Sequence, residues 1–576
     1  MQTLLTDLAG LLLVLCLTAV VFWGWGALAC RVLKINLPQS DKVTVLWVGF
    51  IVVLGWAKAL HFVWAIDWRV TIATAAIGLF GFCSQYPRGL YPACVYLLKK
   101  HGGWFACAAA VLVLVCLRAM GEPNNFDSGL YHFQTIRWIN EYPLTPGLGN
   151  LHWRLGLNQS YFEYIALLNF SPFYNHGYAA GGLFLLLLTV GTVFEFVRHE
   201  GPWARWALTS LLLLALGYYA ATISSPVPDT AVAFIEIVIF LTLIRFFNVW
   251  RLTATGAVPL SEQYGSVVLL LCVVAPMIKL SSAVFAACSG IIVLLMYVRD
   301  YRRLIYVHKR MLLLLGILLL LYAASGYVLT GYPLMPATVG GIPELFWAVP
   351  SKVLDYETKL IYSWARAPGV IDPTPVLGNW QWFSPWLSAL PLGVWLPTLL
   401  GTVLGLCNAF QFKRAPAADK SLFLLYLPLL AALMFWFMTA PDPRFIGVVP
   451  VLYLSLSCLL CIRLNCTQQK NYAASWVVSK PFIRFIFCVA LGLVCIKQLG
   501  LRSVSLNGWV AIPQPVLQEQ LTKQNVRVLT VLTNAQCWNA PLPCAAAFNR
   551  ELLIDWYSFG GLGTQLGLGR YVFSVR

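Results

Sequence analysis

The sequence predicts an all-α integral membrane protein, and three observations support this fold class. Of 576 residues, 60% are hydrophobic and only 11% are charged, whereas soluble domains carry about 25% charged residues. Apolar runs of the roughly 20 residues that a spanning helix needs recur along most of the chain. Lys and Arg collect in alternate loops between these runs, which is the positive-inside pattern of polytopic proteins. Together the runs predict about fourteen transmembrane helices.

The positive charge of the chain does not indicate a nucleic-acid-binding protein. The formal net charge is +17 at pH 7, but the basic residues lie between apolar runs rather than on one patch. Topology signals on cytoplasmic loops account for them, so we expect membrane lipids and no nucleic acid as partners. Most of the 16 cysteines fall inside apolar runs, where Cys behaves as a small hydrophobic residue.

The first apolar run covers residues 4–29, and the first positive charges, at Arg31, Lys34 and Lys42, follow it. No basic segment precedes the run, as one would in a secretory signal, and the charge bias places the N-terminus outside. Alternation from there makes residues 121–177 the first large outer loop. The other runs in this half are 43–65, 70–83, 104–120, 178–197, 206–223 and 230–247.

The apolar block 265–298 contains Pro276 and Lys279, and both of its flanks carry cytoplasmic-type charges. An even number of crossings is needed, so we expect two short helices with Lys279 near the outer turn. The later runs are 311–330, 386–410, 421–440, 445–463 and 481–500, with an outer loop at 331–385. The chain therefore divides into N-terminal helices (1–120), the outer loop (121–177), a transmembrane core (178–500) and an outer tail (501–576).

The outer tail contains a β-branched run at 525–532, which predicts a strand. Cys537 and Cys544 follow this run. In an extracytoplasmic tail the two cysteines would close a small loop as a disulfide. Two free thiols are the alternative, and the C-x₆-C spacing is weak as a metal signature.

The most polar long interval runs from Glu122 to Asn158. Helical phasing predicts an apolar stripe at positions 126, 130, 133 and 136, with Asp127, Tyr131 and Gln134 on another face. We expect this helix to lie in the membrane interface with its polar face turned to water or a cavity. The alternative is that Asp127 only caps the helix.

Polar groups from several loops are predicted to converge on the outer face. Charges near the bilayer usually point into a cavity or pair with each other. Each position also has a structural interpretation: hydrogen bonding in the loop for the histidines, a helix cap for Asp229, and a local ion pair for Asp442 with Arg444. The group comprises Asp127, Tyr131, His132, Arg137, His152, Arg154, Asp229, Lys279, Asp442 and Arg444.

Several phrases of the sequence resemble the GT-C superfamily, the polytopic glycosyltransferases that use polyprenyl- or dolichyl-phosphate-linked sugars. More closely, they resemble an uncharacterised bacterial membrane family with that fold. The match lies in scattered pieces over most of the chain. These pieces are Phe126–His132 (FDSGLYH), Pro146–His152 (PGLGNLH), Ser225–Asp229 (SPVPD), Gly331–Leu334 (GYPL), Pro441–Phe445 (PDPRF) and the segment Gln536–Cys544.

The resemblance implies a bacterial cytoplasmic (inner) membrane protein with Asp127 as catalytic acid or base outside the membrane. Such a carboxylate deprotonates the acceptor hydroxyl or holds a divalent metal that does so. Many members carry two acids in this loop, whereas Ser128 and Gly129 follow Asp127 here, so a metal cofactor is in doubt. Substrate contacts are expected from Tyr131, His132, Arg137, His152, Arg154, Asp229, Lys279 and Arg444, the basic ones facing a lipid phosphate.

Two classes of function are compatible with these features. The first is an enzyme that moves a sugar from a lipid-linked donor, a polyprenyl phosphate, to an extracytoplasmic lipid, glycan or protein. The second is a transporter or flippase of a lipid-linked or polar solute, and a glycan polymerase or ligase is a further alternative. Transporters place charges in mid-span and often show internal repeats, whereas this chain carries its charges on outer loops. The pattern therefore favours the enzyme and leaves the sugar, the acceptor and the oligomeric state open.

Overall fold

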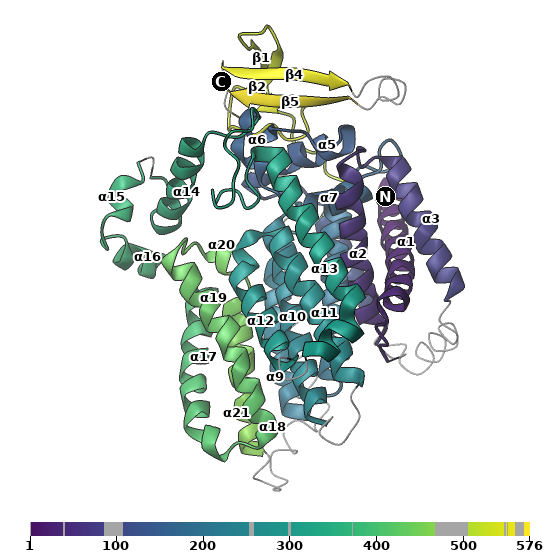
Figure 1. The fold of residues 1–576 in the computed structure, drawn as a ribbon, viewed down its shortest axis with the longest axis vertical. Coiled ribbons are helices and arrows are strands. Elements are labelled where there is room, and N and C mark those ends of the chain that lie inside the picture. Colours follow the sequence, from purple (N-terminus) through teal and green to yellow (C-terminus); the bar gives the residue numbers. More distant parts are fainter. Residues whose placement is uncertain are drawn as a thin grey trace.

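A bundle of long helices with a small sheet at one end forms the protein (Figure 1). The computed structural model describes residues 2–38, 41–85, 108–252, 259–297, 301–370, 372–466, 505–546, 549, 551–558 and 569–575. The predicted run 481–500 and the first residues of the run 104–120 lie outside this part of the chain. The predicted helical membrane architecture is confirmed for the rest.

Eight helices among the described residues are long and apolar enough to cross a membrane, fewer than the fourteen predicted. Several apolar runs form helices that do not meet this requirement, one run breaks in the middle, and the run 481–500 lies outside the described residues. The eight are α1 (Gln2–Leu33), α2 (Lys42–His61), α8 (Gly177–Val197), α10 (Pro228–Leu252), the segment Leu280–Tyr297, α13 (Tyr301–Thr330), α17 (Leu392–Gln411) and the segment Ser421–Met438.

Shorter apolar helices cover most of the other predicted runs. α9 (Pro202–Ala220) covers the run 206–223 and lies outside the group of eight. The remaining ones in the part of the chain with coordinates are α3 (Trp68–Ser84), the helix Ala108–Ala119, α11 (Pro259–Ile278) and α21 (Val449–Cys466).

The helix break at Lys279 is confirmed. α11 ends at Ile278, Lys279 has extended backbone, and the chain continues through η4 (Leu280–Ser282) into α12 (Ala283–Tyr297). Pro276 lies in the last turn of α11, where its ring and missing N–H weaken the helical hydrogen bonds. The break places the mostly buried Lys279 at a helix end, where it pairs with Asp229, instead of in the middle of a continuous span.

Glycines allow the first three helices to pack closely. A Cβ at Gly24 of α1 would lie 1.8 Å from the carbonyl oxygen of Gly78 in α3, and a Cβ at Gly26 would lie 2.0 Å from that of Val45 in α2. α10 lies at the centre of the bundle, with 94% of its apolar window buried, whereas only 17% of α17 is buried. α17 is therefore a peripheral helix whose apolar side chains face outward.

The loops predicted to be cytoplasmic lie together at one end of the bundle. Arg245 pairs with Asp41 at 3.1 Å, and Arg463 pairs with Glu200 at 2.9 Å. The first turn of α1 lies instead near the tail, because the Asp7 carboxylate accepts from the backbone N–H of residue 509 at 3.1 Å. These contacts agree with the alternation of loops deduced from charge.

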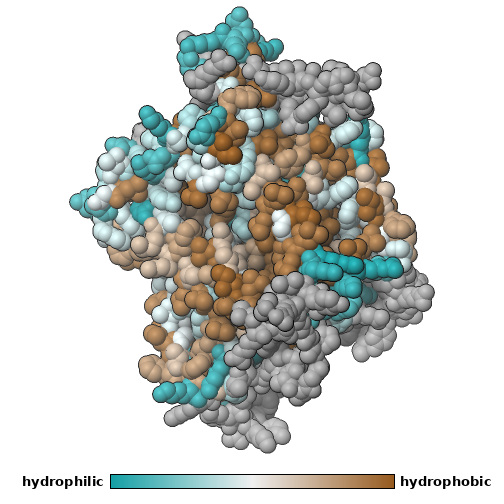
Figure 2. Space-filling view, in the orientation of Figure 1, coloured by the Kyte–Doolittle hydropathy of each residue, from teal (hydrophilic) through white to brown (hydrophobic). Residues whose placement is uncertain are grey.

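The predicted strand at 525–532 is confirmed as β2 (Arg527–Val531). It lies between β1 (Leu517–Leu521), which is antiparallel to it, and β3 (Cys544–Ala545), which is parallel. β4 (Leu552–Ser558) and β5 (Gly569–Val575) form a separate antiparallel pair. The surface is brown over its middle and teal at the sheet end (Figure 2), as expected when the sheet lies outside the apolar belt.

Short helices connect these elements. The long loop after α13 holds α14 (Ser351–Arg366), α15 (Thr374–Leu377) and α16 (Phe383–Ala389), which project to one side of the bundle in Figure 1. The first loop predicted to lie outside holds η1 (Ser128–His132), α5 (Phe133–Glu141), α6 (Leu148–Leu151), η2 (Trp153–Gly156) and α7 (Tyr161–Leu168). The others are η6 (Phe412–Arg414), α18 (Ala417–Lys420) and α20 (Pro443–Ile446), whereas η7 (Ser421–Leu425) and α19 (Tyr426–Met438) together form the span Ser421–Met438.

Candidate functional site

The helix predicted around Asp127 is present as η1 followed by α5. Its polar face was expected to meet water or a cavity, and this was wrong for Gln134, which is 1% exposed. The Gln134 amide donates to the backbone oxygens of Trp538 at 3.1 Å and Ala540 at 2.9 Å. The C-terminal tail therefore folds back over this helix, so that α5 lies between the bundle and the tail.

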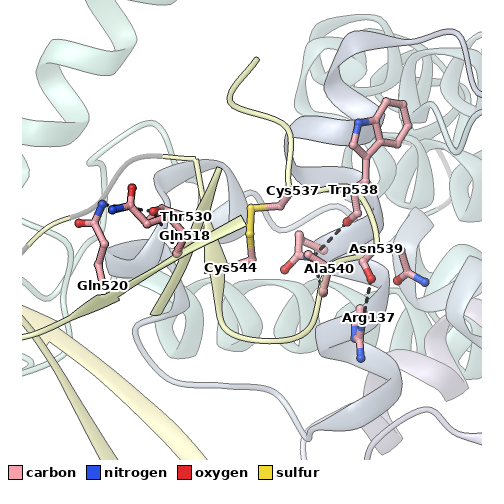
Figure 3. The surroundings of a disulfide bond; sticks show 10 residues. Arg137, Gln518, Gln520, Thr530, Cys537, Trp538, Asn539, Ala540 and Cys544 are labelled. Carbon is pink, nitrogen blue, oxygen red and sulfur yellow. Dashed lines mark hydrogen bonds between the residues drawn. A yellow bond between two sulfur atoms is a disulfide. The ribbon is translucent and has the colours of Figure 1, made fainter. Parts of the chain in front are cut away.

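A disulfide between Cys537 and Cys544 closes the part of the tail that covers η1 and α5 (Figure 3). The N–H of Trp538 donates to the carbonyl oxygen of Gly129 at 2.8 Å. A Cβ at Gly129 would lie 2.6 Å from the Trp538 ring, so the glycine allows this close contact. The cysteine loop thus packs directly on the turn that follows Asp127.

Arg137 belongs to this contact with the tail. Its Nη1 donates to the carbonyl oxygen of Asn539 at 2.7 Å (Figure 3). Its Nε pairs with Glu141 at 2.6 Å. The first contact reaches the tail and the second lies within α5, whereas Asp127 pairs with other arginines. Arg137 is therefore placed to hold the cysteine loop rather than a ligand near Asp127.

Asp127 lies between two guanidinium groups. Its Oδ1 accepts from Nη1 of Arg154 at 2.8 Å, and its Oδ2 lies 3.5 Å from Nη1 of Arg444. The carboxylate makes no helix-capping hydrogen bond, and the Asn125 side chain instead accepts from the Asp127 N–H at 2.9 Å. Ion pairing, and not capping, therefore describes Asp127, which keeps 24% of its side chain exposed.

Aromatic rings hold Arg154 in place. Its guanidinium carbon lies 5.1 Å from the Trp153 ring centroid and 5.9 Å from that of Tyr131. Stacking on aromatic faces restricts the guanidinium without using its donors. Arg154 can therefore keep donors for a second anion while it binds Asp127.

The segment Asp442–Arg444 forms the local ion pair expected from the sequence and also reaches Asp127. Asp442 caps α20, accepting from the Arg444 N–H at 2.8 Å, and its Oδ2 lies 3.3 Å from Nη2 of the same arginine. This cap fixes the turn on which the Arg444 side chain stands. Arg444 then bridges Asp442 and Asp127.

Asp229 and Lys279 form a direct ion pair at the edge of the same group. Asp229 lies in the first turn of α10, inside the helix rather than at its cap. The Lys279 ammonium lies 5.1 Å from the Phe445 ring centroid, and the Arg444 guanidinium lies 5.7 Å from the same ring. The group defined by Asp127, Arg154, Asp229, Lys279, Asp442 and Arg444, called here the ion cluster, has three acids and three bases.

His132 and His152 are uncharged at neutral pH. Burial lowers the pKa of His132 to about 3 and that of His152 to about 4. His132 is 2% exposed, with Nδ1 3.3 Å from the Ser128 hydroxyl and its ring 5.2 Å from Phe162. Neutral imidazoles favour packing and hydrogen-bonding roles over phosphate binding.

Opposing effects act on the acidity of Asp127. Burial raises the pKa of its carboxyl. Nearby positive charge lowers this pKa by more, and it comes from protonated His132, Arg154, Arg444 and Lys279. Since His132 is neutral above its own pKa of about 3, the arginines and the lysine act at neutral pH. Asp127 is therefore ionised there.

The ion cluster is poorly suited to a divalent metal. Within the described part of the chain, no three His, Cys, Asp or Glu side chains gather into a group that could hold a metal. Each cluster carboxylate lies against a cation, and such neighbours repel Mg²⁺, which requires several oxygen ligands. The donor set therefore does not fit a metal-assisted reaction.

A small pocket lies between α2, α5 and α7, and the sequence did not predict its charged lining. Glu163 lines this pocket and pairs with Lys58 of α2 at 2.8 Å, while Lys58 also donates to Asn158. Lys58 falls inside the predicted run 43–65, where a charge marks a buried partner. That rule would have found the pair.

Glu357 of α14 is another acid that the sequence did not single out. Burial raises the pKa of its carboxyl and the positive charge of Arg154 lowers it by less. Because α14 is far from η2 in sequence, only the fold brings Glu357 within electrostatic reach of Arg154. It adds a carboxyl with a raised pKa to the surroundings of the ion cluster.

The fold and the site together define a multi-pass helical membrane protein with an ion cluster where several loops meet at one end of the helix bundle. The chain belongs to the family described as Domain of unknown function (DUF8201), whose model matches residues 9–451. No curated protein and no solved structure matches the chain. The family match includes every residue of the ion cluster and ends before the tail with Cys537 and Cys544.

Proposed function

We propose that the protein is a membrane glycosyltransferase that moves a sugar from a polyprenyl-phosphate-linked donor to an extracytoplasmic acceptor. The observation that carries the proposal is the position of Asp127 between the guanidinium groups of Arg154 and Arg444. A carboxylate can accept a proton from an acceptor hydroxyl, and guanidinium groups bind phosphate with paired donors. The two partners of the reaction would thus meet at one place.

The proposed transfer follows from these two chemistries. The acceptor oxygen forms a bond to the anomeric carbon of the sugar, and the bond from that carbon to the phosphate oxygen breaks. The hydroxyl proton passes to Asp127, and the lipid phosphate leaves with the electron pair beside Arg154 and Arg444. A bound phosphate also competes for these arginines, which raises the pKa of Asp127 toward its ordinary range and makes it a stronger base.

The other residues predicted to contact the substrate have supporting roles in this proposal. Lys279 supplies a further cation for the phosphate, with Asp229 as its counter-ion. Tyr131 faces Arg154 and supports its orientation. His132 and His152 contribute as neutral groups, and Arg137 holds the tail.

A transporter or flippase is the second candidate, because charged residues also lie within candidate spans. Lys58 of α2 is 1% exposed and Glu236 of α10 is 4% exposed. Charges in spans often mark a solute path. The glycosyltransferase is favoured because the acid between two arginines lies on outer loops.

The test is an isosteric change at Asp127. Asp127→Asn should reduce sugar transfer from undecaprenyl-phosphate-linked hexoses by on the order of 100-fold or more, the usual range for removing a catalytic acid or base. Transfer is measured in membranes that contain equal amounts of each protein. Glu551→Gln, an equal loss of charge in an exposed surface pair with Lys523, should keep the wild-type rate.

Native mass spectrometry with undecaprenyl phosphate separates loss of catalysis from loss of folding. The Asp127→Asn protein should still bind this lipid, since the arginines remain. A wild-type transfer rate in this variant would rule out the catalytic assignment. Movement of intact lipid-linked sugar across proteoliposomes without transfer would support the flippase.

A further inference from the structure

The outer loop that contains α14, α15 and α16 exposes a face rich in large apolar side chains. Trp380 is 64% exposed, Leu387 50% and Phe383 37%. Behind them, Trp382, Trp386 and Phe437 pack as an aromatic layer, with Trp382 and Trp386 5.8 Å apart. Such a face is unfavourable in water. Tryptophan and its aromatic neighbours are enriched where a membrane protein meets lipid head groups.

This face continues directly into a helix that faces lipid. α16 ends at Ala389 and α17 begins at Leu392. Leu392 is 59% exposed and Leu399 is 52% exposed, and only 17% of α17 is buried inside the protein. The apolar surface of the loop therefore continues the exposed apolar surface of α17 toward the end of the bundle that carries the ion cluster.

The charges of the loop indicate an apolar, not an electrostatic, contact. Between residues 351 and 391 there are three basic and three acidic side chains, so their formal charges cancel. A partner of strong charge would find no complementary field here. Neutral lipid head groups and the upper acyl chains fit the face better.

Hydrogen bonds connect the loop to the ion cluster. Arg366, at the end of α14, donates to the carbonyl oxygens of Thr439 at 2.7 Å and Met438 at 3.0 Å. The Trp386 indole donates to the carbonyl oxygen of Pro441 at 2.7 Å. These acceptors immediately precede Asp442, so the loop is tied to the turn that carries Arg444.

We infer that residues 351–391 form a membrane foot, a segment that rests in the head-group layer of the leaflet at the ion-cluster end. Its partner is the lipid surface itself. The membrane foot holds the turn Asp442–Arg444 at the level of the head groups, which sets the height of the ion cluster above the bilayer. This role is independent of sugar transfer and goes beyond it.

Photo-crosslinking tests the membrane foot in purified protein reconstituted into vesicles of radiolabelled phosphatidylcholine. Benzoylphenylalanine replaces Trp380 in one variant, Leu399 of α17 in a second and Val516 of the tail in a third. Val516 is a matched control because it is apolar and 61% exposed. Lipid adducts are expected from positions 380 and 399 and not from 516. The yield at position 380 should not change when anionic lipid is added.

Two outcomes overturn the inference. One is a lipid adduct at 399 without one at 380, and the other is an adduct from 380 to a second copy of the chain. A further variant tests the connection to the ion cluster. Trp386→Phe removes the hydrogen bond to Pro441, and amide exchange over 439–445 should rise about fivefold, the effect of one hydrogen bond. Unchanged exchange would show that the foot does not hold the turn.

Discussion

Asp127 is the residue on which the ion cluster depends, because each of its carboxylate oxygens faces a different arginine. Arg154 comes from the same loop as Asp127, whereas Arg444 comes from a turn 317 residues away. The candidate residue could be selected from the sequence, since an acid in a polar loop between apolar runs is a local signal. Its partners could not be assigned, because charge type alone does not say which of several basic residues lies nearest.

His132 gives a pH-dependent prediction at this scale. Its pKa is near 6.5 in the unfolded chain and about 3 in the folded protein, so only the unfolded chain gains a proton as the pH falls below 6.5. The free energy of unfolding is therefore at its full value above pH 6.5, and it decreases as the pH falls toward the pKa of His132 in the folded protein. At pH 5 the loss is roughly 2 kcal/mol.

Thermal unfolding in detergent between pH 7 and pH 5 measures this effect. The wild-type protein should lose stability over that interval, and His132→Gln should lose about 2 kcal/mol less. Gln keeps a hydrogen-bonding side chain next to Ser128. An equal pH dependence in both proteins would contradict a buried neutral His132.

At the scale of elements, the helix η1–α5 shows how local and distant information differ. Its helical character follows from the spacing of its apolar residues, which is a local property. Its burial does not, because Gln134 binds the backbone of a tail segment 404 residues away. A helix with one polar face looks interfacial in the sequence, and only the folded tail shows what covers that face.

The disulfide-closed loop provides a test of this arrangement. Cys537→Ser opens the loop between positions 537 and 544, and loop closure of this length is worth about 2–3 kcal/mol. The contacts from Trp538 and Asn539 to η1–α5 should weaken. Amide exchange at 129–137 should therefore rise in the variant.

Cys407→Ser is the matched control, because Cys407 is a free and exposed thiol. It should leave exchange at 129–137 unchanged. If Cys537→Ser also leaves this exchange unchanged, the cysteine loop does not stabilise the helix that carries Asp127.

At the scale of the whole molecule, the charge pattern of the sequence and the contacts in the structure divide the loops in the same way between the two ends of the helix bundle. Basic loops contact one another at one end, through pairs such as Arg245 with Asp41. The tail, the first turn of α1 and the ion cluster occupy the other. Fewer spans than the fourteen predicted are found among the residues that the structure describes, because hydropathy does not show where an apolar run becomes a short helix.

Epitope insertion tests the proposed orientation. A tag in the turn at 534–535 and a tag after Lys413 should be reached by antibody from opposite sides of the membrane. Antibody should label the first tag in intact spheroplasts, and the second tag only after the membrane has been permeabilised. Labelling of both tags in intact spheroplasts would refute the alternation of loops.

The sequence by itself determined the membrane class, the main helices, the break at Lys279 and the strand β2, since hydropathy, proline position and β-branched runs act over a few residues. The tertiary structure alone decided that Asp127 lies between Arg154 and Arg444 and that the tail covers α5. The contact of Asp127 with Arg444 and that of α5 with the tail join segments hundreds of residues apart, and the free energy of such contacts depends on burial and distance. Neither quantity is encoded in the order of residues along one segment.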